Sequence, residues 1–146
     1  EGCNARELDA GLLATLTGIS ERPSLVVADL SFISLTLILP AITRCTDPGA
    51  ELALLIKPQF EVGRVRDGIV TDPALWREAI LKVLTSAAEN GLGVRGLAPS
   101  PIAGGEGNRE FLVHLLRGEP TDPREWTERI DEVCAPAYTR EEGSGE

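Results

Sequence analysis

The chain has 146 residues, of which 42% are hydrophobic and 25% charged, a composition typical of one globular domain rather than a disordered or fibrous protein. Its 14 basic and 23 acidic residues give a net charge of −9. This charge argues against a self-sufficient nucleic-acid binder, because phosphate contacts need clustered Lys and Arg side chains. Cys3, Cys45 and Cys134 are an odd number at wide spacing, which fits neither a disulfide framework nor a metal knuckle and predicts reduced thiols. No segment resembles a membrane span or an export signal, so we expect a cytoplasmic protein.

The first part of the chain predicts a helix, a strand and a second helix. Leucine spacing over residues 7–17 is typical of a short amphipathic helix. The apolar run 25–28 stops at Asp29, and its lack of polar alternation predicts a parallel strand covered on both faces. Residues 31–45 then predict a helix with Ser31 as its N-cap.

The middle of the chain predicts the same order again. A second apolar run, 52–56, stops at Lys57. Residues 60–71 form a loop rich in glycine and charge, and Asp72 followed by proline predicts the start of a helix. That helix is expected to end at residues 90–91, Asn-Gly.

The last predicted strands have no helix between them. Residues 94–98 alternate in a third strand candidate, with Val94, Gly96 and Ala98 on one side, and residues 110–116 form a fourth. The loop between them could close a hairpin, which would make the last strand antiparallel. Residues 121–123 then cap a final amphipathic helix. Strands alternating with helices predict an α/β sheet.

Three charged residues are expected at one edge of this sheet. The carboxyl ends of parallel strands share an edge, and Asp29 and Lys57 both follow such strands directly. An antiparallel strand begins where its parallel neighbours end, so Glu110 should arrive at the same edge. Neighbouring strands lie about 4.8 Å apart, so the three side chains could meet on one small substrate. For any one of them taken alone, a solvated residue at the boundary of a strand is the favoured interpretation.

Three segments carry a resemblance to a known family: residues 26–35 (VVADLSFISL), 57–64 (KPQFEVGR) and 99–111, which includes Gly107-Asn108-Arg109-Glu110. In this order they resemble the TlyA-type, FtsJ-like RNA 2′-O-ribose methyltransferases. The resemblance implies the later strands of a Rossmann-like, S-adenosylmethionine-dependent methyltransferase sheet, truncated at its N-terminus, with a final antiparallel strand.

The resemblance also implies a catalytic site. Members of the family place a Lys-Asp-Lys-Glu tetrad around the ribose hydroxyl and the methyl donor. By motif, Asp29 matches the aspartate, Lys57 the second lysine and Glu110 the glutamate. Glu110 is preferred to Glu106 because it follows Gly-Asn by two positions and adjoins an apolar strand. The ribose oxygen would attack the methyl carbon once its proton is removed or polarised.

Further residues are assigned to the cofactor by the same resemblance, and to the RNA by their place in the loop after Lys57. Glu1, Asn4 and Asp29 would contact S-adenosylmethionine. Phe60 could stack on a nucleoside, and Arg64 and Arg66 could meet phosphates of the rRNA or ribosomal subunit. The alternative for the two arginines is simple solvated charge. The first tetrad lysine and a Gly-rich cofactor loop have no counterpart in this sequence.

The predicted organisation is a partial methyltransferase domain over 1–118, followed by an acidic helix and tail over 119–146. Because neighbouring carboxylates stabilise a charged amine and the partner lysine is absent, we expect this polypeptide alone to have almost no activity. The alternative is a non-catalytic, degenerate relative that binds a partner. In either case a strand without a neighbour would leave an edge through which the chain could self-associate.

Overall fold

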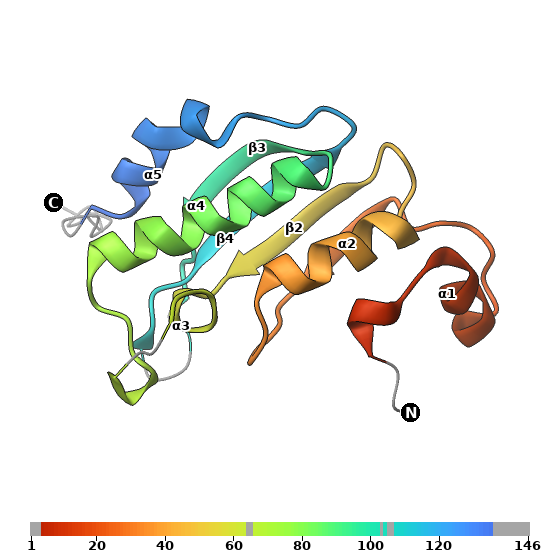
Figure 1. Cartoon of the computed structure of the whole chain (residues 1–146), viewed down its shortest axis with the longest axis horizontal. Helices are drawn as coiled ribbons and strands as arrows, with labels where there is room; N and C mark the ends of the chain where they lie inside the picture. Colours follow the sequence, from red (N-terminus) through yellow and green to blue (C-terminus); the bar gives the residue numbers. More distant parts are fainter. Residues whose placement is uncertain (1–3, 64–65, 103, 105–106, 136–146) are drawn as a thin grey trace, which may run out of the picture.

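A computed structural model of the chain describes residues 4–63, 66–102, 104 and 107–135. Its centre is a four-stranded sheet in the order β1–β2–β4–β3 (Figure 1). The strands are β1 (Leu25–Ala28), β2 (Glu51–Ile56), β3 (Leu92–Pro99) and β4 (Phe111–Arg117). β1 is parallel to β2, whereas β4 is antiparallel to both β2 and β3. The predicted α/β sheet with a final antiparallel strand is therefore confirmed.

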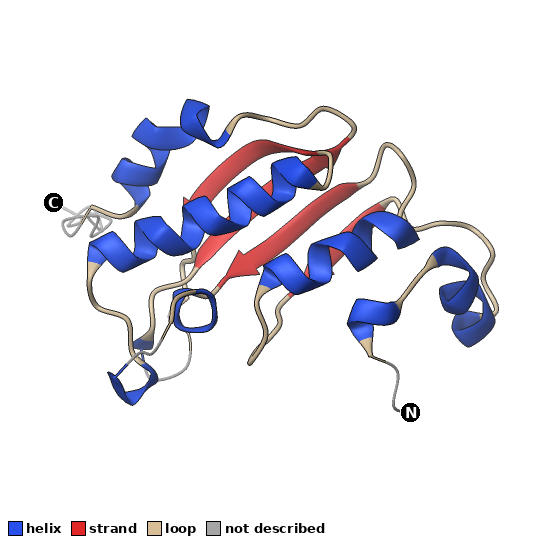
Figure 2. Ribbon diagram, viewed as in Figure 1, coloured by secondary structure: helices blue, strands red, loops and turns tan. Residues whose placement is uncertain are grey.

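Three helices lie along one face of this sheet (Figure 2): α2 (Leu35–Cys45), α4 (Pro73–Glu89) and α5 (Thr127–Val133). Asp72 caps α4 as predicted, with its carboxylate accepting a hydrogen bond from the Ala74 amide at 2.9 Å. The helices and the sheet enclose one hydrophobic core, whose largest fully buried side chains include Leu39, Leu54, Ile80, Leu84, Phe111 and Val133. The final helix therefore packs on the same core as the sheet.

Short helices fill the connections. They are η1 (Ala5–Glu7), α1 (Ala10–Thr17), α3 (Pro58–Glu61), η2 (Arg66–Gly68) and η4 (Pro123–Trp126). The helix predicted over 7–17 is thus divided, because the Asp9 side chain caps a new helix by accepting a hydrogen bond from the Leu12 amide. The loop predicted over 60–71 contains the end of α3 and all of η2.

The N-cap of the second helix differs from the prediction. Ser34, not Ser31, caps α2, and its hydroxyl accepts a hydrogen bond from the Thr36 amide at 3.1 Å. Residues 29–33 are therefore a loop at the carboxyl end of β1. Within it, Phe32 has a φ of 64°, a left-handed conformation that is unusual for a bulky side chain.

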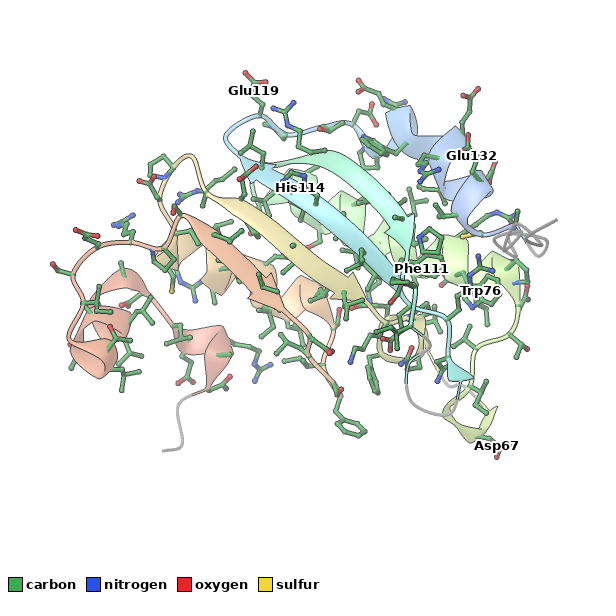
Figure 3. The ribbon with its side chains drawn as sticks, turned by 180° about the vertical axis from the view of Figure 1, so that it is seen from behind. Asp67, Trp76, Phe111, His114, Glu119 and Glu132 are labelled. Atoms are coloured by element: carbon green, nitrogen blue, oxygen red, sulfur yellow. The ribbon has the colours of Figure 1, made fainter. Side chains whose placement is uncertain are left out.

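The prediction that the strand over 25–28 is covered on both faces is wrong. Val27 is 74% exposed, and Leu25 is exposed beside it. Seen from behind in Figure 3, the sheet face that carries His114 has no helix over it in the described part of the chain. Leu25 and Val27 therefore face outward, whereas Val26 and Ala28 pack against the core.

The alternation predicted for the third strand also needs correction. The pairing of β3 with β4 shifts register between Val94 and Gly96, as in a β-bulge. After the bulge, Leu97 rather than Ala98 joins Val94 in the core.

The thiols agree with the sequence prediction within the described residues. Cys45 and Cys134 are free and buried, and burial raises the pKa of the Cys134 thiol to about 11. Cys3 and the acidic tail after residue 135 lie outside the described residues. None of the helices in the described ranges is long and apolar enough to cross a membrane.

Candidate active site

Two of the predicted site residues leave the sheet at adjacent positions. The last residue of β2, Ile56, pairs with the first residue of β4, Phe111. Lys57 directly follows the first of these residues, and Glu110 directly precedes the second. The antiparallel pairing of β2 and β4 therefore brings an amine and a carboxyl group to the same edge.

The Lys57 amine is held by the neighbouring loop. It forms an ion pair with the Asp29 carboxylate and donates a hydrogen bond to the Ser31 hydroxyl at 3.2 Å. The Lys57 side chain is only 11% exposed, whereas that of Asp29 is 65% exposed. The loop after β1 thus supplies an acid and a hydroxyl to an amine carried by β2, and the acid remains open to solvent.

Glu110 is buried and has a different partner. Its carboxylate accepts a hydrogen bond from the Gln59 side-chain amide at 3.1 Å. A Cβ atom added at Gly104 would overlap this carboxylate, so the absent side chain of the glycine makes room for it. In the described part of the chain, Gln59 Oε1 is buried without a hydrogen-bond partner. This leaves an acceptor beside Glu110.

Lys57 and Glu110 both line a hollow of about 320 Å³ at this edge of the sheet. Asp67 and Asn108 border it as well, and Figure 3 shows Asp67 at the outer end of the η2 segment. The buried Asn108 side chain accepts a hydrogen bond from the Val70 amide at 2.9 Å and donates one to the Gly68 carbonyl at 2.7 Å. Asn108 therefore holds the η2 segment against the start of β4.

An aromatic pair forms another border of the hollow. The rings of Phe32 and Phe60 lie 5.1 Å apart between centroids, tilted by 51°. Phe32 is 89% exposed, although it is apolar and its backbone is in the left-handed region. Strained backbone is kept where the surrounding structure requires it, often at functional sites. The two tilted rings offer an apolar aromatic surface at the border of the hollow that Lys57 also lines.

Among the other predicted site residues, Asn4 does not border this hollow. Asn4 caps η1, with its side chain accepting a hydrogen bond from the Arg6 amide at 3.0 Å, and it is not among the residues that border the hollow. Glu1 and Arg64 lie outside the described residues, as does the side chain of Arg66.

Sequence reasoning did not assign several residues that the structure places at this site, among them Ser31, Phe32, Gln59 and Gly104. Ser31, Phe32 and Gln59 lie within three positions of Asp29 or Lys57, so their place in the family-like segments was a usable signal. The packing of Gly104 on a carboxylate had no such signal, because it depends on how a loop folds back on β4.

Comparison with known proteins agrees with this architecture. A model of the FtsJ-like methyltransferase family matches residues 1–117. The chain is 42% identical over 118 residues to the 16S/23S rRNA (cytidine-2′-O)-methyltransferase TlyA of Mycobacterium tuberculosis, covering 79% of this chain and 42% of that protein. It is 44% identical over 96 residues to the putative rRNA methyltransferase YqxC of Bacillus subtilis, covering 64% of this chain and 34% of YqxC. The chain therefore spans well under half the length of these relatives.

Solved structures give the same result. A putative hemolysin from Streptococcus thermophilus superposes with a TM-score of 0.81 at 37% identity, over 90% of this chain and 46% of that one. A putative hemolysin from Lactococcus lactis gives a TM-score of 0.77 at 41% identity, over 90% of this chain and 62% of that one.

The fold is that of a Rossmann-like methyltransferase sheet, with the antiparallel strand β4 inserted between β2 and β3. The segment that the family model matches, residues 1–117, includes all four strands. The chain belongs to the FtsJ-like methyltransferase family, and within it to the TlyA type.

Proposed function

We propose that this chain carries the substrate side of an rRNA 2′-O-ribose methyltransferase that uses S-adenosylmethionine. The observation that supports this best is the Lys57 amine, held against Asp29 and Ser31 beside a hollow that Glu110 also lines. An amine and two acids at one sheet edge can bind and orient a sugar hydroxyl. Work on rRNA would also agree with the cytoplasmic location expected from the sequence.

The proposed chemistry is a displacement at carbon. The ribose 2′-oxygen forms a bond to the methyl carbon as the bond from that carbon to sulfur breaks, and the hydroxyl proton leaves the oxygen. When bound, S-adenosylmethionine supplies the activated methyl group. Lys57 would polarise the hydroxyl or accept its proton. Only the second of these roles requires a neutral amine. Asp29, through its ion pair with Lys57, would hold the amine at this edge of the sheet.

The residues present suit such a cofactor. The exposed carboxylate of Asp29 favours a positively charged sulfonium or ammonium group. The unpartnered acceptor Gln59 Oε1 suits a hydroxyl or amine donor. Asp29 would therefore face the cofactor, whereas Gln59 and Glu110 would face the ribose. The contributions expected from Glu1 and Asn4 remain predictions from the family resemblance.

The test of this function is a chimera in which residues 1–117 replace the aligned segment of the M. tuberculosis relative. The chimera should methylate ribosomal RNA at a ribose hydroxyl, measured by transfer of a tritiated methyl group and mapping of the site. The isolated chain should bind S-adenosylmethionine weakly by isothermal titration and show almost no turnover. A folded chimera that binds the cofactor but transfers no methyl group to rRNA would contradict the proposal.

The RNA contact can be tested at Phe60, which we propose stacks on a nucleoside together with Phe32. Phe60→Ala in the chimera should raise the dissociation constant for the rRNA substrate about tenfold, since base–aromatic stacking contributes about 1–3 kcal/mol. Cofactor affinity should not change. The control Phe60→Tyr keeps the ring and should bind like the parent. Equal RNA affinity of the alanine variant and the parent would exclude Phe60 from RNA binding.

A second candidate function is a non-catalytic binding module, which the exposed face and edge of β1 favour. Val27 and Leu25 are exposed there, and in the described residues β1 pairs only with β2. Such an edge can recruit another strand, including that of a second copy. The cofactor titration separates the two functions, because a binding module need not bind S-adenosylmethionine.

A further inference from the structure

Glu61 is a buried acid with no role in the chemistry described so far. Its side chain is only 1% exposed, although it ends the short helix α3 next to the hollow. An ionised carboxyl group is rarely buried unless hydrogen bonds or charges compensate for the lost water. The compensating groups therefore show what the side chain holds in place.

Two of these groups belong to the start of α2. The Glu61 carboxylate accepts a hydrogen bond from the Ser34 hydroxyl at 2.6 Å and another from the Leu35 amide at 2.7 Å. Ser34 is the N-cap and Leu35 the first residue of α2. The amino end of an 11-residue helix favours an anion, both through its free amides and through the helix dipole.

The third group comes from α4. The Lys82 amine lies 3.7 Å from the Glu61 carboxylate and donates a hydrogen bond to the Glu61 backbone carbonyl at 2.7 Å. Glu61 thus joins three helices, α2, α3 and α4, at the edge of the sheet that carries the site.

These contacts fix two loops relative to each other. Lys57 is the N-cap of α3, and Glu61 is the last residue of the same single turn, so anchoring Glu61 restrains Lys57. On the other side, the anchored Ser34 ends the loop that carries Asp29 and Ser31. The ion pair and the hydrogen bond of Lys57 both cross between these loops.

We propose that Glu61 is a positioning residue that holds the Lys57 amine against Asp29 and Ser31 by tying the turn after β2 to the amino end of α2. The catalytic role given to Lys57 rests on the proposed function. The position of its amine, however, can be measured without RNA or cofactor.

The test uses the fact that the sequence contains only two lysines, Lys57 and Lys82. Competitive acylation of the folded chain with acetic anhydride, followed by peptide mass spectrometry, gives the rate of each amine separately, with the N-terminal amine as internal standard. In Glu61→Ala, Lys57 should be acylated about threefold faster or more, as expected when a partly exposed ion pair is lost. Glu61→Gln keeps an acceptor for the Leu35 amide and should give an intermediate rate.

The matched control is Glu89→Ala, which removes an exposed acid at the end of α4 and should leave the Lys57 rate unchanged. If Glu61→Ala does not fold, Ser34→Ala removes one of the hydrogen bonds without removing charge and should raise the Lys57 rate in the same direction. Circular dichroism identifies which of these variants are folded. If Lys57 in a folded variant is acylated at the wild-type rate, the inference is overturned, even when the melting temperature of that variant is lower. An inactive chimera would overturn the proposed function while leaving this rate difference intact, so the two failures are distinguishable.

Discussion

Lys57→Gln in the chimera should lower the rate of methyl transfer about a thousandfold, because a positioned acid or base contributes about 10²–10⁴ in rate. Glutamine is neutral and shorter, so it can neither accept the ribose proton nor pair with Asp29. The affinity for S-adenosylmethionine should change little, because the amine is assigned to the ribose rather than the cofactor. Single-turnover methyl transfer with saturating cofactor measures the chemical step directly.

The matched control for Lys57 is Arg22→Gln, which removes an exposed cation from the loop before β1, at the opposite end of that strand from Asp29. This variant should retain the parent rate. A Lys57→Gln variant that transfers methyl groups within about tenfold of the parent would remove Lys57 from general acid–base catalysis.

Gly104→Ala should reduce methyl transfer by about ten- to a hundredfold, because a small misplacement of an orienting group has an effect of this size. The new Cβ atom would occupy the space of the Glu110 carboxylate. A carboxylate is the free end of a flexible side chain and can rotate away. We therefore expect the carboxylate to lose its hydrogen bond from Gln59, while the free energy of unfolding falls by only about 1 kcal/mol.

Gly49→Ala is the matched control, because a Cβ atom at this glycine would meet no other atom within 4 Å. Its urea midpoint and its methyl-transfer rate should both stay close to those of the parent. If Gly104→Ala retains full activity, the position of the Glu110 carboxylate does not matter for the reaction, and Glu110 loses its proposed role.

The strand ends could be predicted because they are local features of the sequence. An apolar run that stops at a charge marks the end of a strand, and this local pattern predicted the positions of Asp29 and Lys57. The start of α4 at Asp72 could be predicted in the same way, since a capping carboxylate followed by proline is a local helix signal.

The choice between Ser31 and Ser34 as N-cap was not local. Both are serines ahead of the same apolar helix, and the sequence favours neither. Ser34 caps α2 where its hydroxyl also meets the Glu61 carboxylate, 27 positions away in the chain. Ser31 is left in the loop, where it accepts a hydrogen bond from Lys57. The position at which α2 begins thus goes together with a contact between Ser34 and Glu61, which lie in distant segments of the chain.

By itself, the sequence determined the order of helices and strands and the charged residues that emerge at one edge of the sheet. These follow from hydrophobic patterning over a few neighbouring residues. Only the tertiary structure decided the partners of those charges: Asp29 and Ser31 for Lys57, Gln59 for Glu110 and the helix amino end for Glu61. Such pairs join residues 26 to 51 positions apart, so they depend on strand register and helix packing rather than on any local pattern.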